Sequence, residues 1–261
     1  MDTRKLNPEI GYGDRSVRGL GFGWTASACP DSAESQTFPL DSLAELDLVN
    51  AQAAAVEHRG RKAVKVAMTE AMQKASLSNA AGDRTSLAVL PVEFQNGTIE
   101  VEIAAVVNGR GARDARGFAG IAFRVSPKGE AYEAVYLRMT NGRLADPPPG
   151  APRNIRAIQY VSHPKWDFDA LRKAAPDVYE KGADIAPGPW FRYRLEIEGT
   201  TMRAFLGDAV QPALVVTDMK LGANAKGRIA LFVDDGTDAF FSNLKVAHQE
   251  IEWVNPIGNA T

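Results

Sequence analysis

The chain has 261 residues, 45% of them hydrophobic and 24% charged, which is the composition of an ordinary folded protein. Its 30 Lys and Arg residues against 32 Asp and Glu give a formal net charge of -2, so there is no basic excess to neutralise a phosphate backbone and we expect no nucleic-acid partner. The single cysteine excludes an internal disulfide framework and a cysteine-rich zinc site.

Membrane and export signals are missing from the chain as written. No run of about 18 apolar residues occurs, so we expect no membrane span. Residues 1–8 lack the apolar core of a secretory signal. A trimmed signal would leave the same start and would place the protein in the periplasm or outside the cell. The sequence indicates neither the compartment nor the oligomeric state.

The first 36 residues are predicted to form an irregular arm. Gly19, Gly21 and Gly23 have the spacing of a phosphate loop, but no apolar strand precedes them and no helical pattern follows. We therefore expect three parts: the arm over 1–36, a β-sandwich domain over 37–250 and a tail over 251–261.

From about residue 61 the hydrophobic period is two, which is typical of strands with one buried face. Apolar residues alternate with polar ones over 99–107, 120–125 and 191–198, and the turn at 198–201 leads into 202–206, which predicts a hairpin. Further strands are expected at 61–67, 131–140, 154–162, 213–219, 227–234 and 239–247. Nine or ten strands without crossover helices predict an all-β fold, an antiparallel two-sheet jelly-roll sandwich with short helical insertions. The expected core residues are Ile121, Phe123, Leu195, Ile197, Leu231 and Leu244.

Two stretches interrupt this pattern. Residues 68–76 are compatible with a short helix or with an irregular connection. Residues 167–175 predict two helical turns capped by Asp167 and ended before Pro176. Together with the prolines at 147–149, the second stretch makes a long excursion between strands, and such loops are often functional.

The strand around residues 132–139 has two distinguishable faces. Tyr136 and Arg138 share one face, and on an exposed sheet they would stand beside Arg124 of the preceding strand. Aromatic rings that stack on sugars next to Arg donors favour a glycan cleft. The alternative is that these side chains decorate a solvated sheet face.

The window 159–166 combines an amide, a phenol, an imidazole and an indole in Gln159, Tyr160, His163 and Trp166. His163 is a candidate general acid or base, or else a surface histidine before a proline. His58 and His248 are distant in sequence, so we expect no metal site from histidines.

Carboxylates give two weaker candidates. Glu100 and Glu102 share a strand face, where they are either an acid–base pair or a solvated pair. The acidic segment 234–238 is compatible with a structural calcium ion, but a simple turn is the favoured interpretation, so no cofactor is expected.

Several segments resemble the concanavalin A-like lectin/glucanase superfamily, and within it the laminin-G-like and 3-keto-disaccharide hydrolase type of bacterial domain. They are 117–124, 132–138 with Asn141-Gly142-Arg143, Gln159-Tyr160 with Pro164, 187–190, 227–233 and 241–246. The resemblance covers about residues 37–248 and implies a jelly roll whose concave sheet binds carbohydrate. Val135 stands where the 3-keto-disaccharide branch has glutamine.

These observations predict a carbohydrate-active protein that binds a glycoside in the groove and acts on it as a hydrolase or lyase. The alternative is a non-catalytic glycan-binding or structural module. Predicted catalytic residues are His163 and Glu133; predicted substrate-binding residues are Arg124, Tyr136, Arg138, Asn141, Arg143, Gln159, Tyr160 and Trp166.

Overall fold

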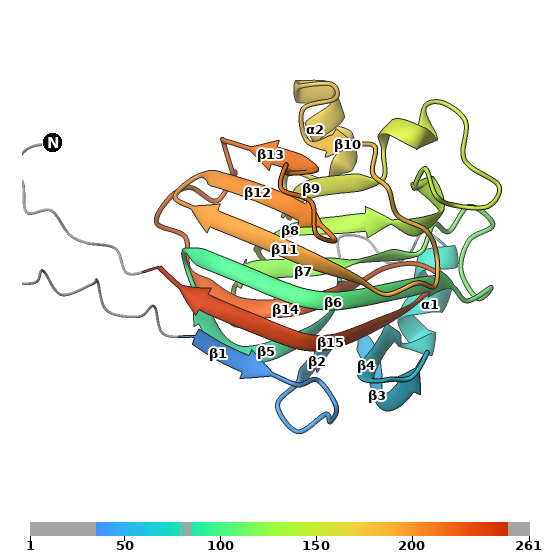
Figure 1. Cartoon of the computed structure of the whole chain (residues 1–261), viewed down its shortest axis with the longest axis horizontal. Helices are drawn as coiled ribbons and strands as arrows, with labels where there is room; N and C mark the ends of the chain where they lie inside the picture. Colours follow the sequence, from blue (N-terminus) through green and yellow to red (C-terminus); the bar gives the residue numbers. More distant parts are fainter. Residues whose placement is uncertain (1–34, 79, 81–84, 250–261) are drawn as a thin grey trace, which may run out of the picture. The chain divides into compact units, whose positions relative to one another are not determined.

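The computed structural model describes residues 35–78, 80 and 85–249 (Figure 1). The predicted tail at 251–261 and all but the last two residues of the predicted arm lie outside these described residues. The first described strand, β1, begins at Ser35 and pairs with β15.

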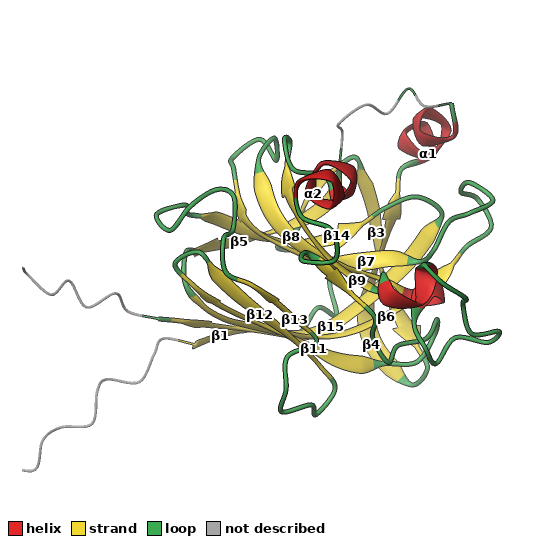
Figure 2. Cartoon of the chain, turned by 90° about the horizontal axis from the view of Figure 1, so that it is seen from above, coloured by secondary structure: helices red, strands yellow, loops and turns green. Residues whose placement is uncertain are grey.

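The described chain forms two antiparallel sheets, seen as separate layers in Figure 2. The eight-stranded sheet has the order β13 (Leu214–Val216), β12 (Thr201–Leu206), β11 (Phe191–Glu198), β6 (Gly97–Val107), β15 (Thr237–His248), β4 (Arg61–Met68) and β3 (Ala51–His58), with β1 (Ser35–Phe38) also on β15. The seven-stranded sheet has the order β10 (Glu180–Lys181), β9 (Ile158–His163), β8 (Tyr132–Arg138), β7 (Phe118–Val125), β14 (Gly227–Val233), β5 (Ser86–Phe94) and β2 (Asp47–Val49). The predicted all-β sandwich is confirmed.

The core lies between the two sheets. All six residues predicted for it, Ile121, Phe123, Leu195, Ile197, Leu231 and Leu244, are at most 1% exposed. The sheets are also joined by a hydrogen bond, because the Tyr193 hydroxyl on β11 donates to the Val135 carbonyl on β8 at 3.0 Å. Val135 is fully buried and pairs with the core residue Ile121, so its side chain faces the core and the residues on either side of it in β8 face outward.

Helices are short and peripheral. They are α1 (Glu70–Leu77), α2 (Phe168–Ala174) and two 3-10 turns, η1 (Met139–Asn141) and η2 (Arg153–Ile155). Asp167 caps α2 as predicted, its Oδ1 accepting from the Ala170 N–H at 2.7 Å. In the part of the chain that the structure describes, neither helix has the length and apolarity that crossing a bilayer needs.

Two long strands were not predicted from the sequence. β3 is rich in alanine, which has little strand preference, so its alternation is weak. β5 contains Pro91, which argues against a strand, but the register of β5 against β14 shifts between Val89 and Glu93. Pro91 therefore lies in a bulge, where its missing N–H costs no ladder bond.

Candidate functional site

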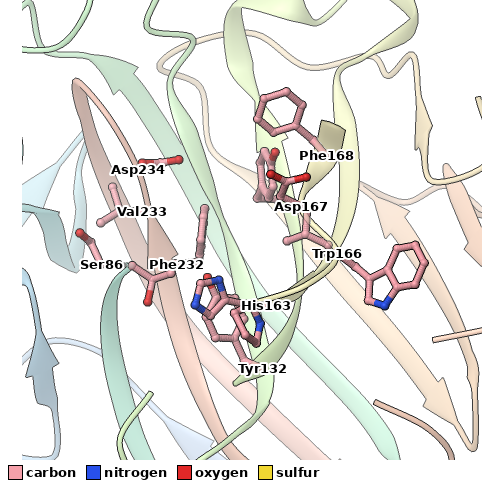
Figure 3. A pocket seen from close by; sticks show the side chains of 13 residues that line it. Ser86, Tyr132, His163, Trp166, Asp167, Phe168, Phe232, Val233 and Asp234 are labelled. Atoms are coloured by element: carbon pink, nitrogen blue, oxygen red, sulfur yellow. The ribbon is translucent and has the colours of Figure 1, made fainter. Parts of the chain in front are cut away.

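A cavity of about 230 Å³ opens on the outer face of the seven-stranded sheet (Figure 3). Its lining comes from four strands, one loop and the start of α2. These are Thr85 and Ser86 at β5, Tyr132 and Tyr136 of β8, Val161 and His163 of β9, Pro164, Trp166 and Asp167 of the loop after β9, Phe168 of α2, and Phe232 to Asp234 at the end of β14. Tyr132 and Tyr136 reach it together because they are four residues apart on one strand.

The cavity floor is made by aromatic rings that meet over a glycine. Tyr136 pairs with Gly120, and Gly120 pairs with Phe232 on its other side. Because Gly120 has no side chain, the Tyr136 and Phe232 rings stack over it with centroids 5.2 Å apart. A Cβ atom at Gly120 would lie 2.5 Å from the Tyr136 Cα. Gly120 therefore determines the shape of this floor.

Aromatic side chains also form the two sides. The His163 imidazole stacks on the Tyr132 ring with centroids 5.0 Å apart. Phe168, 41% exposed, stands at the rim on the first turn of α2. Tyr132, Tyr136 and Phe232 are only 2–6% exposed, so among these rings Phe168 offers the most surface to a ligand. Aromatic rings are the side chains that contact the C–H faces of sugars.

Two carboxyl groups line the same cavity. Asp234 follows β14, and in Figure 3 its carboxyl group lies on the other side of the cavity from Asp167 and Phe168. Burial raises the pKa of Asp234 from its ordinary 3.8 to about 6, although the Asp235 N–H donates to it at 2.8 Å. Asp167 uses one oxygen as the cap of α2. The Asp234 carboxyl group therefore keeps its proton to a higher pH than an ordinary aspartate does.

Glu133 does not reach this cavity. It follows Tyr132 along β8, so it points to the opposite face of the sheet and is fully buried. Its carboxylate accepts from the Tyr160 hydroxyl and from the Leu221 N–H, and burial raises its pKa. The structure therefore separates the two predicted catalytic residues, Glu133 and His163, and places Tyr160 with Glu133.

The expectation that Arg124 stands beside Tyr136 and Arg138 on an exposed face is wrong. Between the pairs Ala122–Ala230 and Val125–Arg228, β7 has one residue more than β14, and Arg124 has φ 55°. This bulge takes the side chain out of the alternation. Arg124 is 2% exposed and donates to main-chain carbonyls of residues 95, 199 and 222. It anchors loops between the sheets and does not reach the cavity.

Arg138 shares the face of Tyr136, as predicted, but it is buried. Its guanidinium donates to the Tyr136 hydroxyl at 3.0 Å and to the side-chain Oε1 of Gln159 at 3.3 Å, and it lies 3.4 Å from the Glu180 carboxylate. Gln159 is fully buried in the same network. Arg138 and Gln159 therefore support the wall behind Tyr136 and do not meet solvent.

The remaining predicted binding residues are dispersed. Asn141 is buried and donates to the Arg156 carbonyl at 2.9 Å. Arg143 is exposed and paired with Asp184 at 2.6 Å. Trp166 belongs to the cavity lining, but Figure 3 shows its indole directed away from His163 and Asp234. Of the ten predicted site residues, the structure places Tyr136, His163 and Trp166 at the cavity.

The other acidic candidates have partners of their own. Glu102 pairs with Arg61 at 3.0 Å. In the 234–238 turn, Asp235 accepts from the Ala112 N–H, and Asp238 pairs with Lys65 and Arg110. Within residues 35–78, 80 and 85–249, no group of three His, Cys, Asp or Glu side chains is arranged to hold a metal ion. The carboxylates of this turn therefore point to different neighbours.

Sequence reasoning missed Asp234, Phe232, Phe168 and Ser86. Phe232 lies in β14 and Asp234 follows its end, and both belong to residues 227–234, which were predicted as a strand. Phe232 meets the Tyr136 ring because it pairs with Gly120, and this strand pairing cannot be inferred from a single sequence.

The fold has counterparts among solved structures. A galectin-like protein of unknown function from Bacillus subtilis is similar with a TM-score of 0.52 and 11% identity, over 84% of this chain and 97% of that one. The carbohydrate binding module CBM66 from Bacillus subtilis (TM-score 0.47, 12% identity, 77% and 98% covered) and a Bacillus licheniformis β-glucanase (TM-score 0.44, 11% identity, 82% and 98% covered) are also similar. No family model and no curated protein matches the chain. At 11% identity the likeness to the galectin-like structure shows the fold alone, a jelly-roll sandwich.

Proposed function

We propose that the cavity binds one sugar ring of a glycoside and that the protein cleaves the glycosidic bond of that ring. The observation that carries this proposal is the convergence of stacked aromatic rings with a half-buried carboxyl group of raised pKa, Asp234, in one cavity. A carbohydrate binding module and a β-glucanase among the structural neighbours are consistent with it.

The size of the cavity supports a single ring. Pockets for drug-sized ligands have volumes of about 300–1,000 Å³. The cavity has about 230 Å³, so it accommodates one ring or the end of a longer glycan. The side chains of Tyr132, Tyr136 and Phe232 supply apolar contacts at the cavity wall, and Ser86 and Asp234 supply hydrogen-bonding groups.

In this proposal Asp234 is the general acid. Its raised pKa keeps a proton on the carboxyl group at mildly acidic pH. That proton passes to the glycosidic oxygen as the bond to the anomeric carbon breaks, and water supplies the hydroxyl group that the carbon gains. The proton released by the water goes to His163 or Asp167, which line the same cavity. Its return to Asp234 completes the cycle.

The test is a product assay with methyl and aryl glycosides and 3-keto-glycosides, with and without divalent metal. The parent protein should release product from at least one of them. Asp234→Asn and His163→Gln should each lower turnover about 10²–10⁴-fold while sugar binding persists. Asp41→Asn, on the exposed loop before β2, is the matched control and should leave turnover unchanged.

Two results would contradict the proposal. Sugar binding without product from any glycoside would make the protein a glycan-binding module, as the alternative has it. Full turnover in Asp234→Asn would remove this residue from the reaction.

A further inference from the structure

The turn that carries Asp234 is attached to α1 and to the loop before β7. The next residue, Asp235, accepts hydrogen bonds at one carboxylate oxygen from the side chains of Gln73 and Ser76 on α1. Its other carboxylate oxygen accepts from the Ala112 N–H at 2.8 Å. Three segments that are far apart in the sequence therefore meet at the carboxylate of Asp235.

Gln73 holds this turn with both ends of its side-chain amide. The amide nitrogen donates to the Asp235 carboxylate, and the amide oxygen accepts from the Gly236 N–H at 3.1 Å. Only this orientation of the amide suits both partners, because a carboxylate accepts and an N–H donates. The Gly236 carbonyl in turn accepts from the Asn108 N–H at 2.8 Å. The main chain that follows Asp234 is thus held by α1 on one side and by the loop before β7 on the other.

The fixed turn determines where the Asp234 side chain lies. The Asp235 N–H donates to the Asp234 carboxyl group at 2.8 Å, and the Asp234 N–H donates to the Phe118 carbonyl of β7 at 3.2 Å. Asp234 is therefore placed by the sheet through its own N–H and by the turn through the N–H of its neighbour. A shift of the main chain at Asp235 would carry the Asp234 carboxyl group out of its place at the cavity.

Asp235 also brings a negative charge next to Asp234. Its hydrogen-bond donors are an amide, a hydroxyl and a main-chain N–H, and these uncharged groups do not neutralise it. Burial makes the largest contribution to the raised pKa of Asp234 and the Asp235 charge adds to it, whereas the Asp235 N–H and the charge of Arg138 lower that pKa. The cavity lining adds the titratable side chains of Asp167, His163, Tyr132 and Tyr136.

We propose that Gln73 and Asp235 are positioning residues of the proposed reaction, which hold the turn after β14 so that the Asp234 carboxyl group faces the glycosidic oxygen. This inference rests on the proposed function. Gln73 and Asp235 are not among the residues that line the cavity, so they act on the reaction through Asp234. A general acid must lie within hydrogen-bond reach of the atom that it protonates, and a displacement of about 1 Å can cost up to about 100-fold in rate.

The experiment separates the position of Asp234 from its charge environment with two variants of the full chain. Gln73→Ala removes the amide and leaves both carboxylates, so kcat on the glycoside that the parent cleaves should fall about tenfold or more while KM changes little. Lys74→Ala, an exposed neighbour on α1, is the matched control and should keep the parent kcat.

Asp235→Asn removes the negative charge and keeps the shape of the side chain. The Asp234 carboxyl group should then titrate about half a unit or more lower, as followed without substrate by carbon NMR of the carboxyl groups. The pH at which kcat/KM falls should move down by the same amount, because the acid loses its proton earlier. Asp114→Asn, which removes an exposed carboxylate from the loop before β7, should leave both midpoints unchanged.

Three results have distinct meanings. A Gln73→Ala variant that is less stable in urea but has the parent kcat when folded would show a structural role alone and overturn the inference. An unchanged titration of Asp234 in Asp235→Asn would overturn it as well. Absence of product from the parent would overturn the proposed function, whereas the NMR titration would still decide whether Asp235 acts on Asp234.

Discussion

Replacing Asp234 by Asn is expected to stabilise the protein in a pH-dependent way. The folded state raises the pKa of this carboxyl group from 3.8 to about 6, so ionisation is easier in the unfolded chain. The ionised group therefore opposes folding as the pH rises above about 4, and the full penalty applies above about 6. The difference between the two pKa values corresponds to about 3 kcal/mol at most.

Asn keeps the shape of the side chain and an oxygen that accepts from the Asp235 N–H, but it carries no charge. The assay is urea denaturation of the parent and of Asp234→Asn between pH 4 and pH 8. The variant should gain stability relative to the parent as the pH rises to about 7 and then keep a constant advantage. A stability difference independent of pH, or a variant less stable than the parent at pH 7, would refute the reasoning. Asp41→Asn should show no such trend.

Three further predictions concern the same region. Glu180→Gln leaves three arginines around a neutral group and should cost about 3–5 kcal/mol in denaturation experiments, whereas the exposed Glu198→Gln should cost little; equal values would contradict the role of Glu180. Gly120→Ala should cost about 1–3 kcal/mol and weaken sugar binding in calorimetry, because a methyl group there would press on the main chain of β8 at Val135 and Tyr136 and displace the Tyr136 ring; unchanged affinity would contradict this view of the floor. If Asp234 is the acid, kcat/KM should fall as the pH rises through about 6, and a flat profile over that range would argue for another donor.

The alternation of apolar residues was sufficient to predict most strands and the core. It works for Ile121, Leu195 and Leu231 because each lies on the face of its strand that meets the core. The alternation fails at Arg124, because one extra residue in β7 turns the Arg124 side chain away from the sheet face that the sequence pattern predicts for it. A single bulge of this kind has no signature in the hydrophobic pattern.

The candidate site was harder to predict than the fold. His163 and Tyr136 were found because they combine functional side chains with a strand end or an outer face. The burial of Arg138 depends on Glu180, which is 42 residues away in sequence and reaches it through the pairing of β10 with β9. Asp234 looked like an ordinary turn residue, and its raised pKa arises from burial that only the tertiary structure provides.

The most direct test of the central claim is a crystal structure of the protein with its best-binding glycoside. A sugar ring should lie in the cavity, stacked on Tyr136 or Tyr132, with its glycosidic oxygen within hydrogen-bond distance of Asp234. A sugar bound on the outer face of the eight-stranded sheet, with the cavity free of it, would contradict the account.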